Sequence, residues 1–177
     1  MIDSKTLILG GVRSGKSRLA ERLATQSQLP VTYIATATIE DAEMQARIEL
    51  HRANRPVHWQ VIEEPLQLAA VVSQVAAKDH CLLVDCLTLW LTNLLLHQDS
   101  TVFEHEHAAF LSVLLNLPGR IILVSNETNM GVIPMGELSR RYCDEAGKLH
   151  QLVAQQCEQV ILMVAGLPHY LKGGSGG

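Results

Sequence analysis

Residues 10–17 read Gly-Gly-Val-Arg-Ser-Gly-Lys-Ser, and this stretch decides the fold. It matches the pattern G-x-x-x-x-G-K-[ST], in which two glycines, a lysine and a serine stand at fixed positions. Glycines let the main chain turn tightly and direct its N–H groups at phosphate oxygens. The lysine of such a loop reaches the β- and γ-phosphates of a nucleotide, and the serine hydroxyl binds Mg²⁺. The pattern predicts a phosphate-binding loop with Lys16 as a catalytic residue, made of Gly10, Gly11, Val12, Arg13, Ser14, Gly15, Lys16 and Ser17.

The segments on either side of the loop favour this interpretation. Thr6–Leu9 is apolar and predicts a strand directly before the loop, and Ser17–Thr25 has the spacing of a helix directly after it. The N-terminal end of that helix would add its positive dipole to the phosphate site. The alternative is a glycine turn that contains Lys-Ser by chance.

The rest of the chain alternates predicted strands with predicted helices. Short apolar runs predict strands at Val31–Ala35, Cys81–Asp85, Arg120–Ser125 and Val160–Val164, with a weaker candidate at His58–Ile62. Helical patterns occupy Ile39–Asn54, Pro65–Ala77, Thr88–Leu96, Glu104–Leu115 and Glu137–Cys157. This order predicts an α/β fold, a single P-loop NTPase domain over residues 1–172 with a mostly parallel sheet flanked by helices. Residues 173–177 are Gly/Ser-rich and are expected to be a flexible tail.

The composition narrows the class of protein. The chain has 177 residues, of which 47% are hydrophobic and 18% are charged, with a formal net charge of -4. Such a chain has no general basic field, so nucleic acid is not the expected partner. The four cysteines form no C-x-x-C pair and are interpreted as reduced thiols of a cytoplasmic protein. The N-terminus leaves no room for a signal peptide before the loop, and no apolar run is long enough to span a bilayer.

Two polar groups follow other predicted strands. Asp85 ends the run Cys81–Asp85, at the edge of the sheet where α/β proteins bind ligands, and is a candidate Mg²⁺ ligand together with Ser17. The alternative is that Asp85 caps the next helix. The polar residues Ser125–Asn129 follow another strand, and they are either part of the same site or a turn with asparagine caps.

A segment rich in histidine and arginine lies between the second and third predicted strands. Residues 46–56 read A-R-I-E-L-H-R-A-N-R-P and place His51 beside guanidinium groups, which suits a triphosphate. A neutral imidazole can act as a nucleophile or as a base. On a helical wheel, however, His51 falls near Met44 and Ile48, so that a packed core histidine is the alternative. The run Glu104–His107 is interpreted as a solvated helix start, because i,i+2 residues do not share a helix face.

Six stretches together resemble one known family. They are G-G-V-R-S-G-K-S at 10–17, Y-I-A-T-A at 33–37, A-R-I-x-x-H-R-x-x-R-P at 46–56, L-L-V-D-C-L-T-x-W-x-T-N-L-L at 82–95, S-N-E-T-N-M-G-V-I-P at 125–134 and R-R-Y-C-D-E-A-G-K-L-H-Q at 140–151. This combination is similar to the bifunctional adenosylcobinamide kinase / adenosylcobinamide-phosphate guanylyltransferases of cobalamin biosynthesis. The resemblance extends from about Leu7 to Gly166 and implies a RecA-like P-loop fold.

The resemblance implies two reactions and a set of residues. Adenosylcobinamide is phosphorylated with ATP or GTP, and GMP is then transferred from GTP to the new phosphate. His51 would carry the guanylyl group, with Mg²⁺ as the metal. Further GTP contacts implied by the resemblance are Ala35, Thr36, Ala37, Arg52, Ala53, Asn54, Arg55, Glu63 and Asp85. The family can have glutamate where Asp85 stands, so the shorter side chain puts its reach to metal or ribose in doubt. The family assembles as a trimer, so a homotrimer is expected here.

Two other functions remain as alternatives. A monofunctional P-loop kinase with a structural His51 would transfer only the γ-phosphate. A non-catalytic nucleotide switch would bind nucleotide and a partner protein without turnover, although the sequence has no charged tail that would recruit one.

Overall fold

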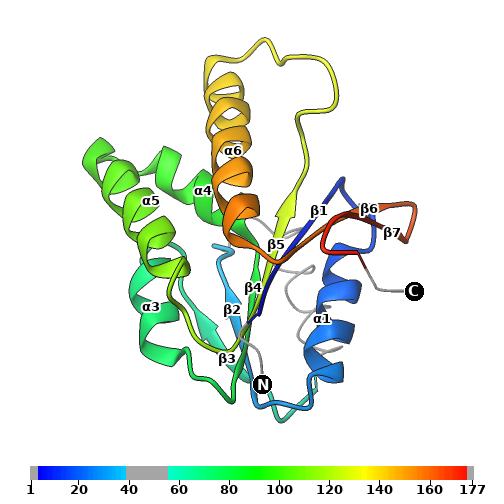
Figure 1. Ribbon diagram of the computed structural model, residues 1–177. Coiled ribbons are helices and arrows are strands. Elements are labelled where there is room, and N and C mark those ends of the chain that lie inside the picture. The colour runs from blue at the N-terminus through cyan, green and yellow to red at the C-terminus, as the bar shows by residue number, and fades with distance from the viewer. Residues whose placement is uncertain (1–3, 39–55, 175–177) are drawn as a thin grey trace.

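The computed structural model of the chain describes residues 4–38 and 56–174. Its elements are β1 (Ser4–Gly10), α1 (Lys16–Gln26), β2 (Val31–Ala35), β3 (Gln60–Glu63), α3 (Leu68–Val75), β4 (Cys81–Asp85), α4 (Leu87–Leu96), α5 (Ser100–Leu114), β5 (Arg120–Asn126), α6 (Glu137–Gln156), β6 (Gln159–Val164) and β7 (Leu167–Lys172). The described strands form one sheet in the order β3-β2-β4-β5-β1-β6-β7, parallel except for the pair β6–β7 (Figure 1). The predicted α/β fold with a mostly parallel sheet is therefore confirmed.

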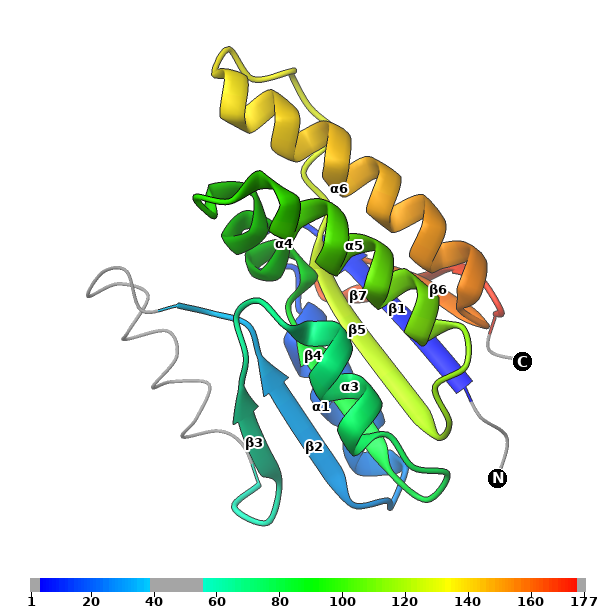
Figure 2. The same cartoon turned by 90° about the vertical axis from the view of Figure 1, so that its left-hand side faces the viewer.

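Helices cover both faces of the sheet. Helix α1 lies on one face, while α3, α4, α5 and α6 lie on the other (Figures 1 and 2). Side chains of one strand alternate between the two layers, because Leu7 and Leu9 pack in the cluster under α3–α6 and Ile8 packs in the cluster under α1. Both layers are apolar, which is why the strands are continuous apolar runs without alternation. Within the described residues, no helix is both long and apolar enough to cross a membrane.

Two helices begin more than one residue away from their predicted starts, because side chains bond to the main chain ahead of them. Helix α5 begins at Ser100 rather than at Glu104, because the Asp99 carboxylate accepts from the Thr101 N–H at 2.9 Å. The run Glu104–His107 therefore lies inside the helix, and the predicted helix start was wrong. Helix α3 begins at Leu68, after a turn in which Glu64 Oε1 accepts two main-chain N–H groups at 2.8 and 2.7 Å.

The edges of the sheet also differ from the prediction. The weaker candidate strand at His58–Ile62 is β3 at Gln60–Glu63, because Trp59 N–H closes a turn onto Pro56 O at 3.1 Å. Strand β7 was not predicted, and it forms a hairpin with β6 after a turn at Ala165 and Gly166, which both have positive φ. The predicted helix Ile39–Asn54 lies outside the described residues.

The parallel strands bring their carboxyl ends to one edge of the sheet, and the site is built there. The ladder of strand pairs places Asp85 opposite Ala35, and Ala35 opposite Glu63. On the other side of β5, Asn126 lies opposite Gly10. Residues far apart in the sequence therefore meet along this edge, in the order set by the strands.

Candidate active site

The segment Gly11–Gly15 is a tight loop between β1 and α1. Gly10 has a φ of 152°, Arg13 of 54° and Gly15 of 97°. A Cβ atom at Gly10 would lie 2.6 Å from the main-chain oxygen of Met163 on β6, so only glycine fits this close approach. The Gly166 N–H donates to Ser14 O at 3.1 Å and ties the loop to the β6–β7 turn. The predicted strand–loop–helix arrangement is therefore present, and neighbouring strands fix the shape of the loop.

Lys16 is the first residue of α1 and is directed into the loop. Its side chain is buried, and its Nζ donates to Gly11 O at 2.7 Å. Burial lowers the pKa of Lys16 from its ordinary value, whereas the neighbouring acidic groups Cys86 and Asp85 raise it. An ammonium group at the N-terminus of α1, beside the main chain of the loop, attracts phosphate.

Asp85 ends β4 and does not cap the following helix. Cys86 occupies the N-cap position of α4 without a side-chain capping bond. The Asp85 carboxylate instead accepts from the Tyr33 hydroxyl at 3.0 Å. The alternative interpretation of Asp85 as a helix cap is thus wrong. With the half-buried Ser17 on α1, Asp85 offers hard oxygen donors of the kind that Mg²⁺ binds.

The chain after β2 is fixed against the start of α4. Thr36 is fully buried, and its hydroxyl donates to Cys86 O at 2.7 Å while accepting from the Cys86 N–H at 2.9 Å. Asn93 of α4 donates to Thr36 O at 2.8 Å. The predicted contact stretch Ala35–Ala37 therefore lies beside Asp85, in a main-chain conformation set by these bonds.

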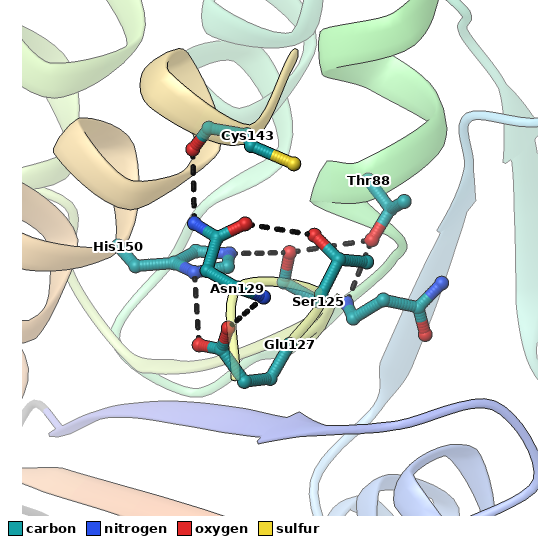
Figure 3. A network of polar contacts seen from close by, with 8 residues as sticks. Thr88, Ser125, Glu127, Asn129, Cys143 and His150 are labelled. Atoms are coloured by element: carbon teal, nitrogen blue, oxygen red, sulfur yellow. Dashed lines mark hydrogen bonds and ion pairs between the residues drawn. The ribbon is translucent and has the colours of Figure 1, made fainter. Parts of the chain in front are cut away.

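The polar residues after β5 form a network with α4 and α6 (Figure 3). The Ser125 hydroxyl lies 2.8 Å from His150 Nε2 and 3.3 Å from Thr88 Oγ1. Glu127 Oε2 lies 3.7 Å from His150 Nδ1, and its Oε1 accepts from the Asn129 N–H at 2.7 Å. The Glu127 N–H donates to Gly10 O at 2.9 Å, which joins this network to the first residue of the phosphate loop.

The interpretation of the segment 125–129 as a turn with asparagine caps is wrong at Asn129. Its side chain caps no helix and donates to Cys143 O, within α6, at 2.9 Å. Ser125 and Glu127, however, face His150 at the edge that carries the loop. His150 lies in α6, whereas its partners Ser125 and Glu127 lie at the end of β5. They share no short motif with His150, so the sequence alone does not pair them.

The predicted site residues divide into three groups by position. The loop residues 10–17, with Ala35, Thr36, Ala37 and Asp85, lie at the same edge of the sheet. Glu63 ends β3, four strands from β1, which at about 4.8 Å per strand is roughly 19 Å from the loop. His51 and the predicted contacts Arg52, Ala53, Asn54 and Arg55 lie outside the described residues.

Relatives of known name match nearly the whole chain. A protein of Pseudomonas aeruginosa named "Bifunctional adenosylcobalamin biosynthesis protein CobP" is 63% identical over 169 residues, which cover 96% of this chain and 98% of the relative. A Salmonella typhimurium protein named "Bifunctional adenosylcobalamin biosynthesis protein CobU" is 36% identical over 179 residues, with 94% and 98% covered.

Solved structures with low sequence identity share the fold. The flagellar accessory protein FlaH of Methanocaldococcus jannaschii superposes with a TM-score of 0.52 at 17% identity, covering 97% of this chain and 81% of that one. The RadB recombinase superposes with a TM-score of 0.51 at 15% identity, covering 90% and 73%. This likeness supports the observed fold, an α/β domain with a mostly parallel sheet.

The sequence family described as "Cobinamide kinase / cobinamide phosphate guanyltransferase" matches residues 6–171. That range contains the phosphate loop, Asp85 and the network after β5. With a near-complete relative at 63% identity, the match leaves no large segment of the chain unassigned. The chain belongs to the cobinamide kinase / cobinamide phosphate guanyltransferase family.

Proposed function

We propose that this enzyme phosphorylates adenosylcobinamide with ATP or GTP and then transfers GMP from GTP to adenosylcobinamide phosphate. The observation that carries the proposal is the buried Lys16 ammonium inside the loop 10–17, in a chain of this family. In the first reaction the substrate hydroxyl oxygen bonds to the γ-phosphorus. The bond from that phosphorus to the bridging oxygen breaks, and a nucleoside diphosphate and a proton leave.

In the second reaction we assign His51 as the nucleophile. An imidazole nitrogen bonds to the α-phosphorus of GTP, and pyrophosphate leaves. A phosphate oxygen of adenosylcobinamide phosphate then displaces the imidazole, which gives adenosylcobinamide-GDP. Dividing the transfer into two displacements through a covalent intermediate is a known advantage of nucleophilic catalysis. The proposal for His51 rests on its place in the stretch A-R-I-x-x-H-R-x-x-R-P.

The loop and the edge of the sheet have separate proposed roles. The main-chain N–H groups of residues 10–17 would bind the phosphates, and Lys16 would offset the negative charge that develops during transfer. Ser17 and Asp85 would hold Mg²⁺, which supplies charge neutralisation of the phosphate oxygens. The hard oxygen donors of both side chains suit that ion.

The other end of the nucleotide would lie along the same edge. Ala35, Thr36 and Ala37 lie beside Asp85, and Glu63 lies about 19 Å from the loop at roughly 4.8 Å per strand, which suits contact with the sugar or the base rather than with the phosphates. The guanidinium groups of Arg52 and Arg55, with Ala53 and Asn54 between them, would add contacts from the segment that carries His51.

We also propose a cytoplasmic homotrimer whose functional domain covers residues 1–172, with 173–177 as a flexible tail. The segment between β5 and α6 extends away from the sheet in both views (Figures 1 and 2). Its exposed large apolar side chains are Met130, Val132, Ile133 and Met135, and Leu138 in the first turn of α6 is exposed as well. An exposed apolar patch of this kind supports an interface between copies. Light scattering on wild type and on the variant Ile133→Asp tests it, because an unchanged mass would remove this segment from the interface.

Two preparations of GTP test the proposed function. With adenosylcobinamide as acceptor, label at the γ-phosphate should enter the corrinoid product first, and label at the α-phosphate should enter the final product. A monofunctional kinase with a structural His51 would transfer only the γ-label. A nucleotide switch without catalysis would transfer neither.

A further inference from the structure

Three elements bring polar side chains together at the carboxyl end of β5 (Figure 3). Thr88 comes from the first turn of α4, Ser125 from β5 and His150 from α6, while Glu127 follows β5. The side chain of His150 is 8% exposed and that of Glu127 is 15% exposed. Burying an imidazole beside a carboxylate is costly unless hydrogen bonds compensate for lost hydration. Either hydrogen bonds offset the cost of burying His150 and Glu127, or the pair is kept because it has a function.

The hydrogen bonds of this network have one favourable direction. The Asn126 N–H donates to Thr88 Oγ1 at 2.7 Å, so the Thr88 hydroxyl hydrogen can point to Ser125, and that of Ser125 to His150 Nε2. The hydrogen of the neutral imidazole then lies on Nδ1, facing Glu127 Oε2 at 3.7 Å. The reverse direction would aim the Nδ1 lone pair at a carboxylate, which is repulsive. The network therefore presents an N–H donor to Glu127.

Glu127 is the carboxylate whose own backbone is bonded to the phosphate loop. Its N–H donates to Gly10 O at 2.9 Å, and β5 is the direct neighbour of β1 in the sheet. Asp85 lies on β4, one strand further away, and accepts from the Tyr33 hydroxyl. At about 4.8 Å per strand, Glu63 is roughly 19 Å away. Asp85 also lies near enough to act on Lys16, but it is assigned to Mg²⁺. Among the described carboxylates at the ends of these strands, Glu127 is the one whose main chain is bonded to the loop.

We propose that Glu127 is the base that takes the proton from the substrate hydroxyl during phosphorylation, and that His150 is a positioning residue that orients the Glu127 carboxylate. This inference rests on the proposed phosphorylation of an alcohol at the loop. As the hydroxyl oxygen bonds to the γ-phosphorus and the bond to the bridging oxygen breaks, the hydroxyl proton moves to Glu127. The proton passes from Glu127 to solvent after the nucleoside diphosphate has formed.

The two reactions of the family differ in their need for such a base. An aliphatic alcohol is protonated at neutral pH and must lose its proton as it attacks. A phosphate monoester, with a second pKa of about 6, is already mostly a dianion at neutral pH. A base next to the loop is therefore needed for phosphorylation and not for GMP transfer. Loss of the base should slow only phosphorylation, whereas structural damage should slow both reactions.

The variant Glu127→Gln tests the base, with Glu104→Gln on the exposed surface of α5 as the matched control. We expect kcat of phosphorylation to fall by about 10²-fold or more, with KM for GTP within about twofold. GMP transfer to preformed adenosylcobinamide phosphate should stay within about threefold of wild type, since binding and folding are preserved. Equal losses in both reactions, or unchanged phosphorylation, would overturn the proposal. Wild-type enzyme without phosphorylation would instead refute the proposed function itself.

Variants of His150 test the positioning role. The amide nitrogen of Asn superposes on Nδ1 of histidine, so His150→Asn keeps a donor toward Glu127, whereas His150→Leu removes it. We expect His150→Leu to lower kcat of phosphorylation by about tenfold to a hundredfold at unchanged KM and unchanged GMP transfer, and His150→Asn to retain most of the activity. His105→Asn on the exposed face of α5 is the control. Equal behaviour of the Asn and Leu variants would contradict the role.

Discussion

The substitution Gly10→Ala places the phosphate loop under a defined strain. The new Cβ would lie 2.6 Å from Met163 O and 2.6 Å from Ser14 Oγ. The serine hydroxyl can rotate away, but the main-chain oxygen belongs to β6 and cannot. The start of the loop must therefore move away from β6 by about 0.8 Å to reach an ordinary contact of 3.4 Å, and overpacking of this kind costs about 1–3 kcal/mol.

The larger effect is on the binding of nucleotide. Hydrogen bonds to a charged group contribute about 1.5–3 kcal/mol each. If the shift misaligns two of those that the loop makes to phosphate, binding weakens by about 3–6 kcal/mol. At about 1.4 kcal/mol per tenfold change, the Kd for GTP should rise by about 10²- to 10⁴-fold.

Calorimetric titration of GTP into the folded variant measures this change, and a thermal unfolding scan accounts for stability. The control is Gly174→Ala, where a Cβ meets no atom within 4 Å. A loss of about 2 kcal/mol in stability should lower Tm by roughly 4–8 °C for a chain of this size. A folded Gly10→Ala variant that binds GTP with wild-type Kd would refute the argument that this loop, in this shape, holds the phosphates.

Further substitutions separate the roles of single residues. Lys16→Ala should lower the rate of both reactions by about 10²- to 10³-fold, and retained phosphorylation would mean that the loop has been misassigned. Asp85→Asn should raise the Mg²⁺ concentration needed for half-maximal activity, and an unchanged requirement would indicate a sugar contact instead. Gly119→Ala should lower Tm at unchanged KM for GTP, because φ is +82° and a Cβ would overlap main-chain oxygens in the loop before β4. Burial lowers the pKa of His107 and His150 below 6.5, so the unfolded state binds more protons and the free energy of unfolding should fall as pH drops below 6.5. Urea titrations at pH 7.5 and 5.5 measure this fall, which the double variant His107→Gln/His150→Asn should reduce.

The sequence predicted those features that depend on local pattern. Two predicted strands, Val31–Ala35 and Cys81–Asp85, match β2 and β4 at both ends, and the other core strands differ by one or two residues at an end. Their apolar runs are long because both faces of the sheet are covered, and this makes a parallel strand easy to find. The loop 10–17 is equally local, since its chemistry requires glycines, lysine and serine at fixed spacing.

The predicted element boundaries were wrong where residues outside the hydrophobic pattern determine where a helix or strand begins. Asp99 begins α5 four residues before the predicted start, and the sequence Asp99-Ser100-Thr101 does contain a capping signal that was not used. Strand β7 is mostly exposed and contains Pro168, so it lacks the apolar pattern of the other strands. It is held by pairing with β6 and by bonds from Lys172 to carbonyl oxygens of α6, and neither is visible in local sequence.

The network at His150 shows the same limit at the site. Glu127 and His150 lie in different elements and meet because β5 and α6 pack at one end of the sheet. No spacing rule connects a residue after a strand with one inside the next helix. The polar residues 125–129 are visible in the sequence as a segment after a predicted strand, but their partner His150 becomes apparent only in the fold.

The most direct test of the central claim is the covalent labelling of the protein by GTP that carries label at its α-phosphate. Wild-type enzyme trapped without corrinoid should retain the label through mild alkali and lose it in acid, as expected for a phosphoramidate on His51. His51→Ala should take up no label and still transfer the γ-phosphate to adenosylcobinamide. Full labelling of His51→Ala would contradict the account, because the guanylyl group would then be carried by another residue.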